Sequence, residues 1–341
     1  MKKIRVIQVG VGGFGKSWME LVMGYENTEL AAIVDMIPDN LAEAKRVTNL
    51  SEDVLFTDSL EAFAKVNADL VLIVTPPKTH NQIAKQAIEA GFHVMMEKPL
   101  THTFEEAEDL LEFTESSDKK VMISQNYRWR PPVQTVKKII EEGIIGRIGY
   151  IEFEFRKAMK FGGWRDQYKE ILLEDMAIHH FDLMRYLLNK EPVEILAQSY
   201  KPDWSWFSGN PTAGVWISFQ DDIKVNYFGS WVSRGKETTW NGDIRVVGDK
   251  GAIEMIDDQV HYYLENEEEG HKVNLTQMKY EDRLASLDEM VTSILENRQP
   301  STSIKDNLKS FMLTCMAISS AQTGQKVIAK DFSPLSLIEH T

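Results

Sequence analysis

The chain has little cysteine, because Cys315 is the only one among its 341 residues. A disulfide needs two thiols, so an internal disulfide framework is excluded and the composition suits a reducing compartment. Long apolar runs are also lacking, since no stretch approaches the roughly 20 apolar residues that span a bilayer. We therefore expect a soluble, cytoplasmic protein that does not insert into membranes.

Positive charge is in short supply as well. The chain has 38 Lys and Arg residues against 52 Asp and Glu residues, which gives a formal net charge of −14. Such a surface repels nucleic acid and anionic membranes, so neither is an expected partner. Apolar residues are plentiful at 43%, and 341 residues exceed what one hydrophobic core usually organises. Two domains are therefore expected.

The first 35 residues predict a nucleotide-binding unit. The β-branched run 4–9 favours a buried strand, and it leads into Gly10-Val11-Gly12-Gly13-Phe14-Gly15. In a G-x-G-x-x-G loop the first glycine permits the tight turn, the second lets the backbone approach a pyrophosphate, and the third allows close helix packing. The amides at the start of the following helix then face two phosphates. A glycine-rich turn without a ligand is the alternative.

Asp35 points to the kind of dinucleotide. It follows a second apolar run, 30–34, and lies about 20 residues after the glycines, where the dinucleotide fingerprint places an acid for the ribose hydroxyls. A carboxylate there repels a 2′-phosphate, and no arginine follows it directly. The sequence therefore predicts NAD in preference to NADP.

Strand and helix patterns keep alternating up to residue 124, which predicts a doubly wound, parallel α/β sheet of six strands. Open sheets of this type bind ligands at the carboxyl ends of their strands. Two segments are expected at that edge beside the glycine loop: Thr75-Pro76-Pro77 with the nearby His80, and Glu97-Lys98-Pro99. The predicted strands are 4–9, 30–34, 54–56, 68–74, 92–96 and 121–124, and the predicted helices after the glycine loop are 38–48, 59–66, 81–90 and 104–116.

The pattern changes at Gln125, so we expect a second, α+β domain over 125–341. An aromatic and basic segment, 126–132, precedes a helix at 133–142. Runs with period two then predict a large, predominantly antiparallel sheet with one packed and one open face. The predicted strands are 150–156, 193–200, 213–219, 223–231, 243–247, 252–256 and 259–264, and two helices are expected at 281–297 and 304–323.

Lys98 is the first candidate for chemistry. Pro99 restricts the backbone before it, which favours an extended Lys98 and a reproducible direction for its ammonium. That ammonium can hydrogen-bond a substrate hydroxyl oxygen and stabilise negative charge as the proton leaves. The alternative is a surface lysine that caps strand carbonyls.

The second candidate is the stretch 174–182. Asp175 and His179 are four residues apart and so share one face of a helix, whereas His180 points about 100° away. An imidazole is the usual general base near neutral pH, and a neighbouring carboxylate supports its protonated form. The alternatives are an ordinary helical pair, or metal ligands with Glu174 and His180 recruited. Hydride transfer needs a base and no metal, so we predict catalysis and no metal site.

Tryptophans mark a third group. Trp164 and Arg165 precede the candidate helix, and Trp204 and Trp206 lie in a loop. Indole faces stack on sugar rings and on nicotinamide, and arginine supplies directed donors. Packing at a domain or subunit interface is the alternative for Trp204 and Trp206.

Taken together and in order, these segments resemble the glucose-fructose oxidoreductase / inositol dehydrogenase / MocA (Gfo/Idh/MocA) family over nearly the whole chain. The resemblance rests on 10–15, Thr75-Pro76-Pro77 with His80, Glu97-Lys98-Pro99, Asn126-Tyr127-Arg128, Trp164-Arg165 and Asp175-x-x-x-His179 with Asp182.

The resemblance implies a Rossmann domain, an open-faced C-terminal sheet that builds homodimers or homotetramers, and a nicotinamide cofactor. It also implies that His179 takes the hydroxyl proton, that Asp175 orients it, and that Lys98 holds the oxygen during hydride transfer. Expected cofactor contacts are Gly10, Gly12, Gly13, Phe14, Gly15, Asp35, Thr75, Pro76, Pro77, His80, Glu97, Lys98, Trp164 and Arg165. Expected substrate contacts are Lys98, Asn126, Tyr127, Arg128, Arg156, Asp175 and His179.

The chain departs from the family pattern just before Asp175. Family members often carry a run of three glycines there, whereas this chain has Lys169-Glu170-Ile171-Leu172-Leu173-Glu174, and Ala177 stands where glycine is common. Because this segment shapes the substrate pocket, the resemblance does not identify the substrate.

Three functions remain. The sequence favours an NAD-dependent dehydrogenase acting on a secondary alcohol of a polyol, inositol or sugar. The second is a glycosidase or lyase of the same fold that uses transient oxidation by a retained NAD. The third is a non-catalytic sugar sensor, which retention of Lys98, Asp175 and His179 argues against.

Overall fold

The computed structural model describes residues 3–332, apart from the side chain of Trp164. The chain divides into two compact units. The first runs to Asn126 and includes Asp282–Leu308, and the second comprises Tyr127–Glu281 and the chain from Lys309 onward. Within residues 3–332, no helix combines the length and the apolarity that crossing a membrane requires.

A parallel six-stranded sheet forms the centre of the first unit, in the order β3-β2-β1-β4-β5-β6. The chain order reverses between β1 and β4, which makes the carboxyl ends of these two strands the usual place for a ligand. The predicted doubly wound α/β fold is therefore confirmed. The strands are β1 (Ile4–Val9), β2 (Thr28–Val34), β3 (Leu55–Phe56), β4 (Leu70–Ile73), β5 (His93–Met96) and β6 (Val121–Ile123).

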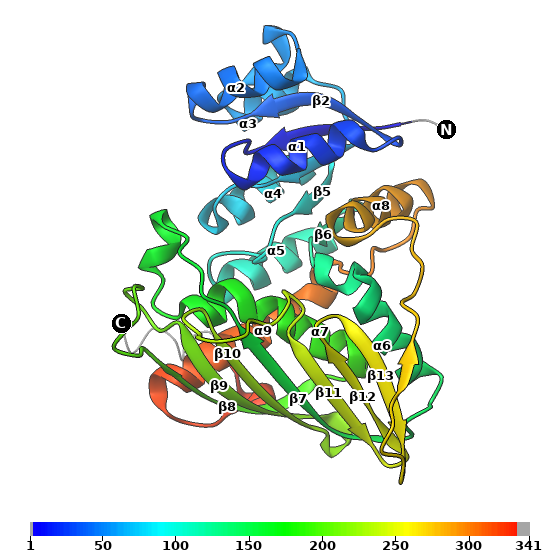
Figure 1. Ribbon diagram of the computed structural model, residues 1–341. Helices are drawn as coiled ribbons and strands as arrows, with labels where there is room; N and C mark the ends of the chain where they lie inside the picture. Colours follow the sequence, from blue (N-terminus) through cyan, green and yellow to red (C-terminus); the bar gives the residue numbers. More distant parts are fainter. Residues whose placement is uncertain (1–2, 333–341) are drawn as a thin grey trace. The chain divides into compact units, whose positions relative to one another are not determined.

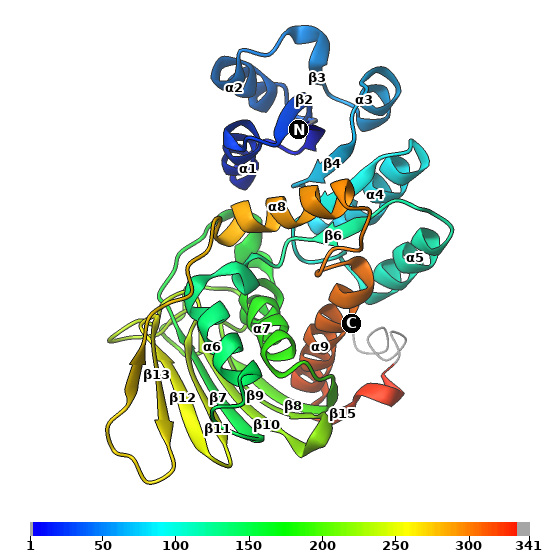
Figure 2. The ribbon, with the colours of Figure 1, turned by 90° about the vertical axis from the view of Figure 1, so that its right-hand side faces the viewer.

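Helices cover both faces of this sheet. Figure 2 shows α1 and α2 on one side and α3, α4 and α5 on the other. Their starts follow local rules: α2 begins with Pro38 in its first turn, and Thr103 and Glu106 form a capping box at the start of α5. The helices are α1 (Phe14–Gly24), α2 (Pro38–Thr48), α3 (Ser59–Lys65), α4 (His80–Glu89) and α5 (Phe104–Glu115).

Helix α8 (Asp282–Leu295) belongs to the first unit, although the sequence analysis assigned the whole of 125–341 to a second domain. The chain after α8 runs beside β6, where the Ile123 amide donates to the Thr302 carbonyl and Met122 bridges Ser303. Both views draw α8 next to β6 (Figures 1 and 2). A segment far along the sequence thus completes the edge of the first sheet.

The second unit is built on a mixed sheet in the order β14-β13-β12-β11-β7-β10-β9-β8-β15. Only β7 and β10 pair in parallel among the strands described there, so the predicted open, predominantly antiparallel sheet is confirmed. The short strands β14 and β15 were not predicted. The strands are β7 (Ile148–Arg156), β8 (Pro192–Tyr200), β9 (Thr212–Phe219), β10 (Lys224–Ser230), β11 (Asp243–Gly248), β12 (Gly251–Ile256), β13 (Gln259–Leu264), β14 (His271–Val273) and β15 (Val327–Ile328).

One face of this sheet packs on α6 (Pro131–Glu141), α7 (Ile178–Leu188) and α9 (Ile304–Thr323) (Figures 1 and 2). Strand β7 alternates accordingly, with Ile151, Phe153 and Phe155 buried and the residues between them exposed. The opposite face is open and carries large apolar side chains, namely Tyr150, Leu196, Tyr200, Trp216 and Phe228.

Candidate active site

The glycine loop connects β1 to α1, and sterics dictate two of its glycines. Gly10 has φ +92°, and a Cβ there would lie 2.5 Å from the Val74 carbonyl oxygen. A Cβ at Gly15 would lie 2.4 Å from the Gly10 carbonyl oxygen. Any side chain at either position forces the backbone apart, so these residues allow the helix to start close against the strand.

The start of α1 fits a dinucleotide. Gly13 precedes the helix with φ +41°, no side chain caps the helix, and Phe14 next to it is half-exposed, while the Gly15 amide donates to the Gly12 carbonyl at 2.7 Å. A Cβ at Gly12 would meet only the side-chain amide of Asn40, 2.8 Å away. The backbone at Gly12 is therefore open to an approaching pyrophosphate.

Two buried polar side chains hold this loop in shape. The amide nitrogen of Gln8 donates to the carbonyl oxygens of Gly10 and Gly15, at 3.0 Å and 2.7 Å. The Asp35 carboxylate, at the end of β2, accepts from the Val11 amide at 2.9 Å and from the Asn40 side chain at 3.1 Å. Asp35 thus stands beside the glycine loop, where the sequence analysis expected a ribose ligand.

The segment after β4 contains His80, one of the expected cofactor contacts. His80 is fully buried, and its ring nitrogens lie 2.9 Å from the carbonyl oxygens of Pro99 and Thr75. Burial lowers the pKa of His80, against the backbone hydrogen bonds, which raise it. A neutral ring donates to only one of the two carbonyls at a time, and the ring fills the space between the two loops. Pro77 is buried too, whereas Pro76 is exposed and Thr75 is partly so.

Glu97 and Lys98 follow β5. Glu97 is buried, accepts from the Trp18 indole at 2.7 Å and from the Lys98 amide at 3.1 Å. Burial raises the pKa of Glu97, while its hydrogen bond from Trp18 and the charge of Lys98 oppose the rise. Lys98 itself is partly exposed. The buried glutamate thus anchors the loop from which the Lys98 side chain extends.

In the second unit, Asp175 lies in a π-helical turn, Leu172–Ala177, that runs directly into α7. The sequence analysis assumed regular α-helix here; π-helical turns are frequent at functional sites. The Arg165 Nε donates to Asp175 Oδ1 at 3.3 Å, so these two predicted site residues are brought together. Trp164 lies beside Arg165 in the 3₁₀ turn Gly163–Gln167, and its side chain is outside the described part of the structure.

The segment before Asp175, where the family often has glycines, is acidic and well anchored. Burial raises the pKa of Glu170 and of Glu174, and the Glu170 amide donates to Glu174 at 2.9 Å. Asn210 holds the segment, because its amide donates to the Lys169 carbonyl and its side chain donates to Glu170. Burial, with added repulsion from Glu174, also raises the pKa of Tyr168. The segment 169–174 is therefore held by hydrogen bonds through its backbone and its glutamate side chains, where the family often has glycines.

His179 is held by an aromatic stack. Its imidazole lies 4.3 Å from the Tyr127 ring, centroid to centroid, with 8° between the planes. The Arg130 guanidinium packs on the Tyr127 ring, with its carbon 3.4 Å from the ring centroid, and it donates a hydrogen bond to the Asn241 side chain at 3.0 Å. Tyr127 is nearly buried. Tyr127, an expected substrate contact, thus also fixes the plane of the candidate base.

The neighbouring His180 has a different role. It is fully buried among aromatic rings, with Nδ1 3.1 Å from the Tyr227 hydroxyl and Nε2 3.3 Å from the Trp240 carbonyl. Burial lowers the pKa of His180 to about 3. The ring is therefore neutral and part of the core, as its direction on the helix predicted.

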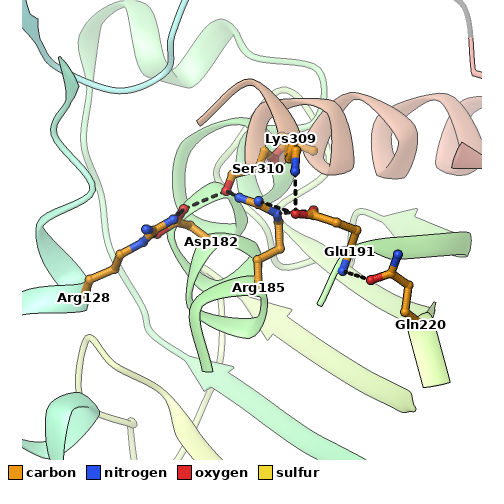
Figure 3. Close-up of polar contacts among 8 residues, drawn as sticks. Arg128, Asp182, Arg185, Glu191, Gln220, Lys309 and Ser310 are labelled. Atoms are coloured by element: carbon orange, nitrogen blue, oxygen red, sulfur yellow. Dashed lines mark hydrogen bonds and ion pairs between the residues drawn. The ribbon is translucent and has the colours of Figure 1, made fainter. Parts of the chain in front are cut away.

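Arg128, one of the expected substrate contacts, has its guanidinium engaged by a carboxylate of the same unit. It is buried and forms a two-pronged pair with Asp182, at 2.7 Å and 2.6 Å. Figure 3 shows that Asp182 continues through Ser310 to Arg185, whose guanidinium pairs with Glu191. With 6% and 1% of their side chains exposed, Arg128 and Asp182 join the turn Asn126–Trp129 to α7, and Ser310 extends the contact to α9.

Two further predicted substrate residues are engaged with neighbours. Asn126 donates to Asp282 within the first unit, which fixes the exit of β6 to the start of α8. Arg156, at the end of β7, pairs with Glu154 and with Asp243, the latter at 2.9 Å. The loop tryptophans Trp204 and Trp206 both donate their indole N–H to main-chain carbonyls and keep much of their surface exposed.

Some residues of these sites could not be predicted from local patterns. Trp18 and Arg130 act through partners that only the folded chain brings near, whereas Gln8 bonds to carbonyls only two and seven residues away. Within residues 3–332 no group of three or more His, Cys, Asp or Glu side chains is arranged to hold a metal ion.

Comparisons with known proteins agree with this geometry. The family model described as "Oxidoreductase family, NAD-binding Rossmann fold" matches residues 4–125, and the GFO/IDH/MocA C-terminal domain matches residues 133–254. The chain belongs to the Gfo/Idh/MocA oxidoreductase family. It is an oxidoreductase of that family with an NAD-binding fold.

Relatives of known and unknown activity lie within this Gfo/Idh/MocA group. D-apiose dehydrogenase of Paraburkholderia graminis is 23% identical, over 97% of this chain and 91% of that protein. Inositol 2-dehydrogenase of Rhizobium meliloti is 29% identical, over 57% of this chain and 58% of that protein. The crystal structure of an oxidoreductase from Agrobacterium radiobacter with NAD+, L-tartaric acid and magnesium matches with a TM-score of 0.88 at 22% identity, covering 96% and 99% of the two chains.

Proposed function

We propose that this member of the Gfo/Idh/MocA family is an NAD-dependent dehydrogenase that acts on a secondary alcohol of a polyol, inositol or sugar. The observation that carries the proposal is the dinucleotide cradle of the first unit, in which Gly10, Gly12 and Gly15 meet a carboxylate, Asp35, beside the loop. The same chain supplies Lys98, Asp175 and His179, which suit proton removal from an alcohol. Relatives named as D-apiose and inositol dehydrogenases add weight to a sugar or polyol substrate.

The chemistry divides among the chain's own residues. The nicotinamide, when bound, accepts or supplies the hydride. Lys98 holds the substrate oxygen with its ammonium and stabilises the charge that develops there. His179 takes the hydroxyl proton on its imidazole, whose plane Tyr127 sets. Asp175 favours the protonated imidazole, and Arg165 keeps the carboxylate oriented.

The preference for NAD over NADP rests on Asp35. The carboxylate is fixed by the Val11 and Ile37 amides, so it cannot swing away from a 2′-phosphate. Met36 and Ile37, which follow it, are exposed and uncharged and offer such a phosphate no counter-charge. Asp35→Ala is expected to weaken NAD binding and to narrow the difference between NAD and NADP, as measured by titration calorimetry with each dinucleotide.

The open face of the second sheet is the proposed subunit interface of a homodimer or homotetramer. Tyr150, Leu196, Tyr200, Trp216 and Phe228 are all at least 37% exposed on that face, and aromatic residues are enriched in such contacts. Light scattering during size-exclusion chromatography tests this, and Trp216→Lys is expected to shift the wild-type oligomer toward smaller species. A monomeric wild type contradicts it.

The decisive test of the activity is an absorbance screen for NADH formation with inositols, hexoses, aminosugars and sugar acids, run in parallel with NAD and NADP. We expect NADH from at least one polyol or sugar, and Lys98→Ala is expected to lower turnover about 10²- to 10³-fold while dinucleotide binding persists. Release of a sugar from a glycoside without net NADH identifies a glycosidase or lyase instead. Dinucleotide binding without any turnover identifies a sensor.

A further inference from the structure

Arg283, in the first turn of α8, lies against the glycine loop although some 270 residues separate the two in sequence. Its guanidinium carbon is 4.7 Å from the centroid of the Phe14 ring and 5.6 Å from that of Trp18. Its Nη1 donates to the Ser17 hydroxyl at 2.6 Å. All four residues belong to the first unit, so the end of the dinucleotide cradle carries a cation from a distant segment.

The Arg283 guanidinium rests against two aromatic rings close to the N-terminus of α1. Phe14 is the first residue of α1, and the first turn of that helix contains no acidic residue. The N-terminus of a helix carries a partial positive charge, so a guanidinium beside it is repelled unless negative charge joins both. The buried Glu97 feels the charge of Arg283 only weakly, after its hydrogen bond from Trp18 and the charge of Lys98.

We propose that Arg283 is a dinucleotide-binding residue, which contributes a charged donor to the pyrophosphate held by the glycine loop. The inference rests on the proposed use of a nicotinamide dinucleotide. A pyrophosphate brings two negative charges to the N-terminus of α1, and a guanidinium supplies paired donors suited to phosphate oxygens. Arg283 lies outside the two stretches that the family descriptions match, 4–125 and 133–254. Helix α8 therefore takes part in ligand binding as well as in the packing of the first unit.

A purely structural role is the rival explanation, because the bond to Ser17 fastens α8 to α1. Three variants separate the two roles. Arg283→Met keeps a long apolar side chain against Phe14 and Trp18 but removes the charge. Arg283→Lys keeps the charge and loses the paired donors. Ser17→Ala removes the fastening bond and leaves the charge in place.

The experiment is titration calorimetry of each full-length variant with NAD and with ADP-ribose at two salt concentrations, together with thermal unfolding of the ligand-free proteins. Arg283→Met is expected to weaken both ligands by a similar factor, about 10- to 100-fold, because a hydrogen bond to a charged group is lost. The affinity of Arg283→Met should also depend less on salt concentration than that of the wild type. Arg283→Lys should recover part of the affinity, and Ser17→Ala should bind within about threefold of wild type.

Other results overturn the inference. Unchanged affinity in Arg283→Met removes the residue from the site. A loss for NAD without a loss for ADP-ribose moves Arg283 to the nicotinamide end, and an equal loss in Ser17→Ala assigns the effect to the fastening of α8. If the wild-type protein binds neither NAD nor NADP, the proposed function fails first, so the two failures are distinguishable.

Discussion

The second unit contains two ion pairs between an aspartate and an arginine, and the two pairs differ in how far they are exposed to solvent. Asp182 and Arg128 have 1% and 6% of their side chains exposed, whereas Asp175 and Arg165 have 11% and 35%. The first pair is closed off by Ser310 and the network drawn in Figure 3. The second lies on the π-helical turn next to the candidate base. Exposure, and not residue type, distinguishes the enclosed pair from the more open pair.

The adjacent histidines repeat this contrast. His179 stacks on Tyr127 at the start of α7, while His180 is enclosed by Phe153, Phe155 and Tyr227. One residue along a helix turns a side chain by about 100°, which here takes an imidazole from a stack on one tyrosine ring to a position enclosed by several rings, with exposed fractions of 7% for His179 and 0% for His180.

The largest expected effect separates the two histidines in activity. His179→Ala should lower turnover about 10²- to 10⁴-fold and remove the rise of the oxidation rate with pH, because the general base is lost. His180→Gln, the matched control, should keep most of the turnover under conditions in which it is folded. Steady-state rates from pH 6 to 10 measure both; a wild-type pH profile in His179→Ala excludes it as the base.

The second expected effect is a difference between Asp182 and Asp175 in their contribution to the free energy of unfolding. Asp182→Asn leaves the Arg128 charge buried without its counter-charge and is expected to cost about 3–5 kcal/mol of unfolding free energy. Asp175→Asn, at the more open pair, is expected to cost less than about 1 kcal/mol. Urea unfolding of both variants measures this. Equal losses would show that exposure does not distinguish the pairs.

The third effect is the pH dependence that His180 imposes. Its pKa is about 3 in the folded protein against 6.5 for an ordinary histidine, so the unfolded chain binds the extra proton between these values. Stability therefore rises with pH across this window and is lost as the pH falls from about 6.5 toward 3. From pH 7 to pH 5 the contribution is about 2 kcal/mol.

Other groups also titrate there: the lowered pKa of His80 acts in the same direction, and the raised pKa values of Glu97, Glu170 and Glu174 act against it. The difference between wild type and His180→Gln isolates one contribution. The urea midpoint should fall less between pH 7 and pH 5 in His180→Gln than in the wild type. An equal fall of the midpoint in both proteins would contradict the burial argument.

The smallest effect tests the open pair itself. Arg165→Met should lower stability by less than about 1 kcal/mol, since a half-exposed arginine is screened by water. Urea unfolding at low and high salt checks this. A loss comparable with that of Asp182→Asn would place Arg165 among the structural residues.

Much of the fold was accessible from the sequence. The alternation of strand and helix up to residue 124 predicted the parallel sheet, and the period-two runs predicted the open one, because the side-chain period of each element is local. The two-residue β15 and the three-residue β14 were missed since such short strands depend on their neighbours for pairing. The return of 282–308 to the first unit was missed for the same reason: Thr302 and Ser303, which follow α8, pair with Ile123 and Met122, far away in sequence.

In the candidate site, the predicted residues of the dinucleotide cradle have partners nearby along the chain, whereas Arg128 and Arg283, whose contacts were not predicted, have distant partners. The glycine loop and Asp35 lie within 26 residues, and the steric demands on Gly10 and Gly15 come from the adjacent backbone and the next strand, so the sequence alone determined the dinucleotide cradle. Only the tertiary structure decided that Arg128 and His80 face inward, and that Arg283 faces the cradle. The reason is physical: the role of a charged or titratable side chain depends on which partners desolvate and neutralise it, and those of Arg128 and Arg283 come from elements 54 and 266 residues away.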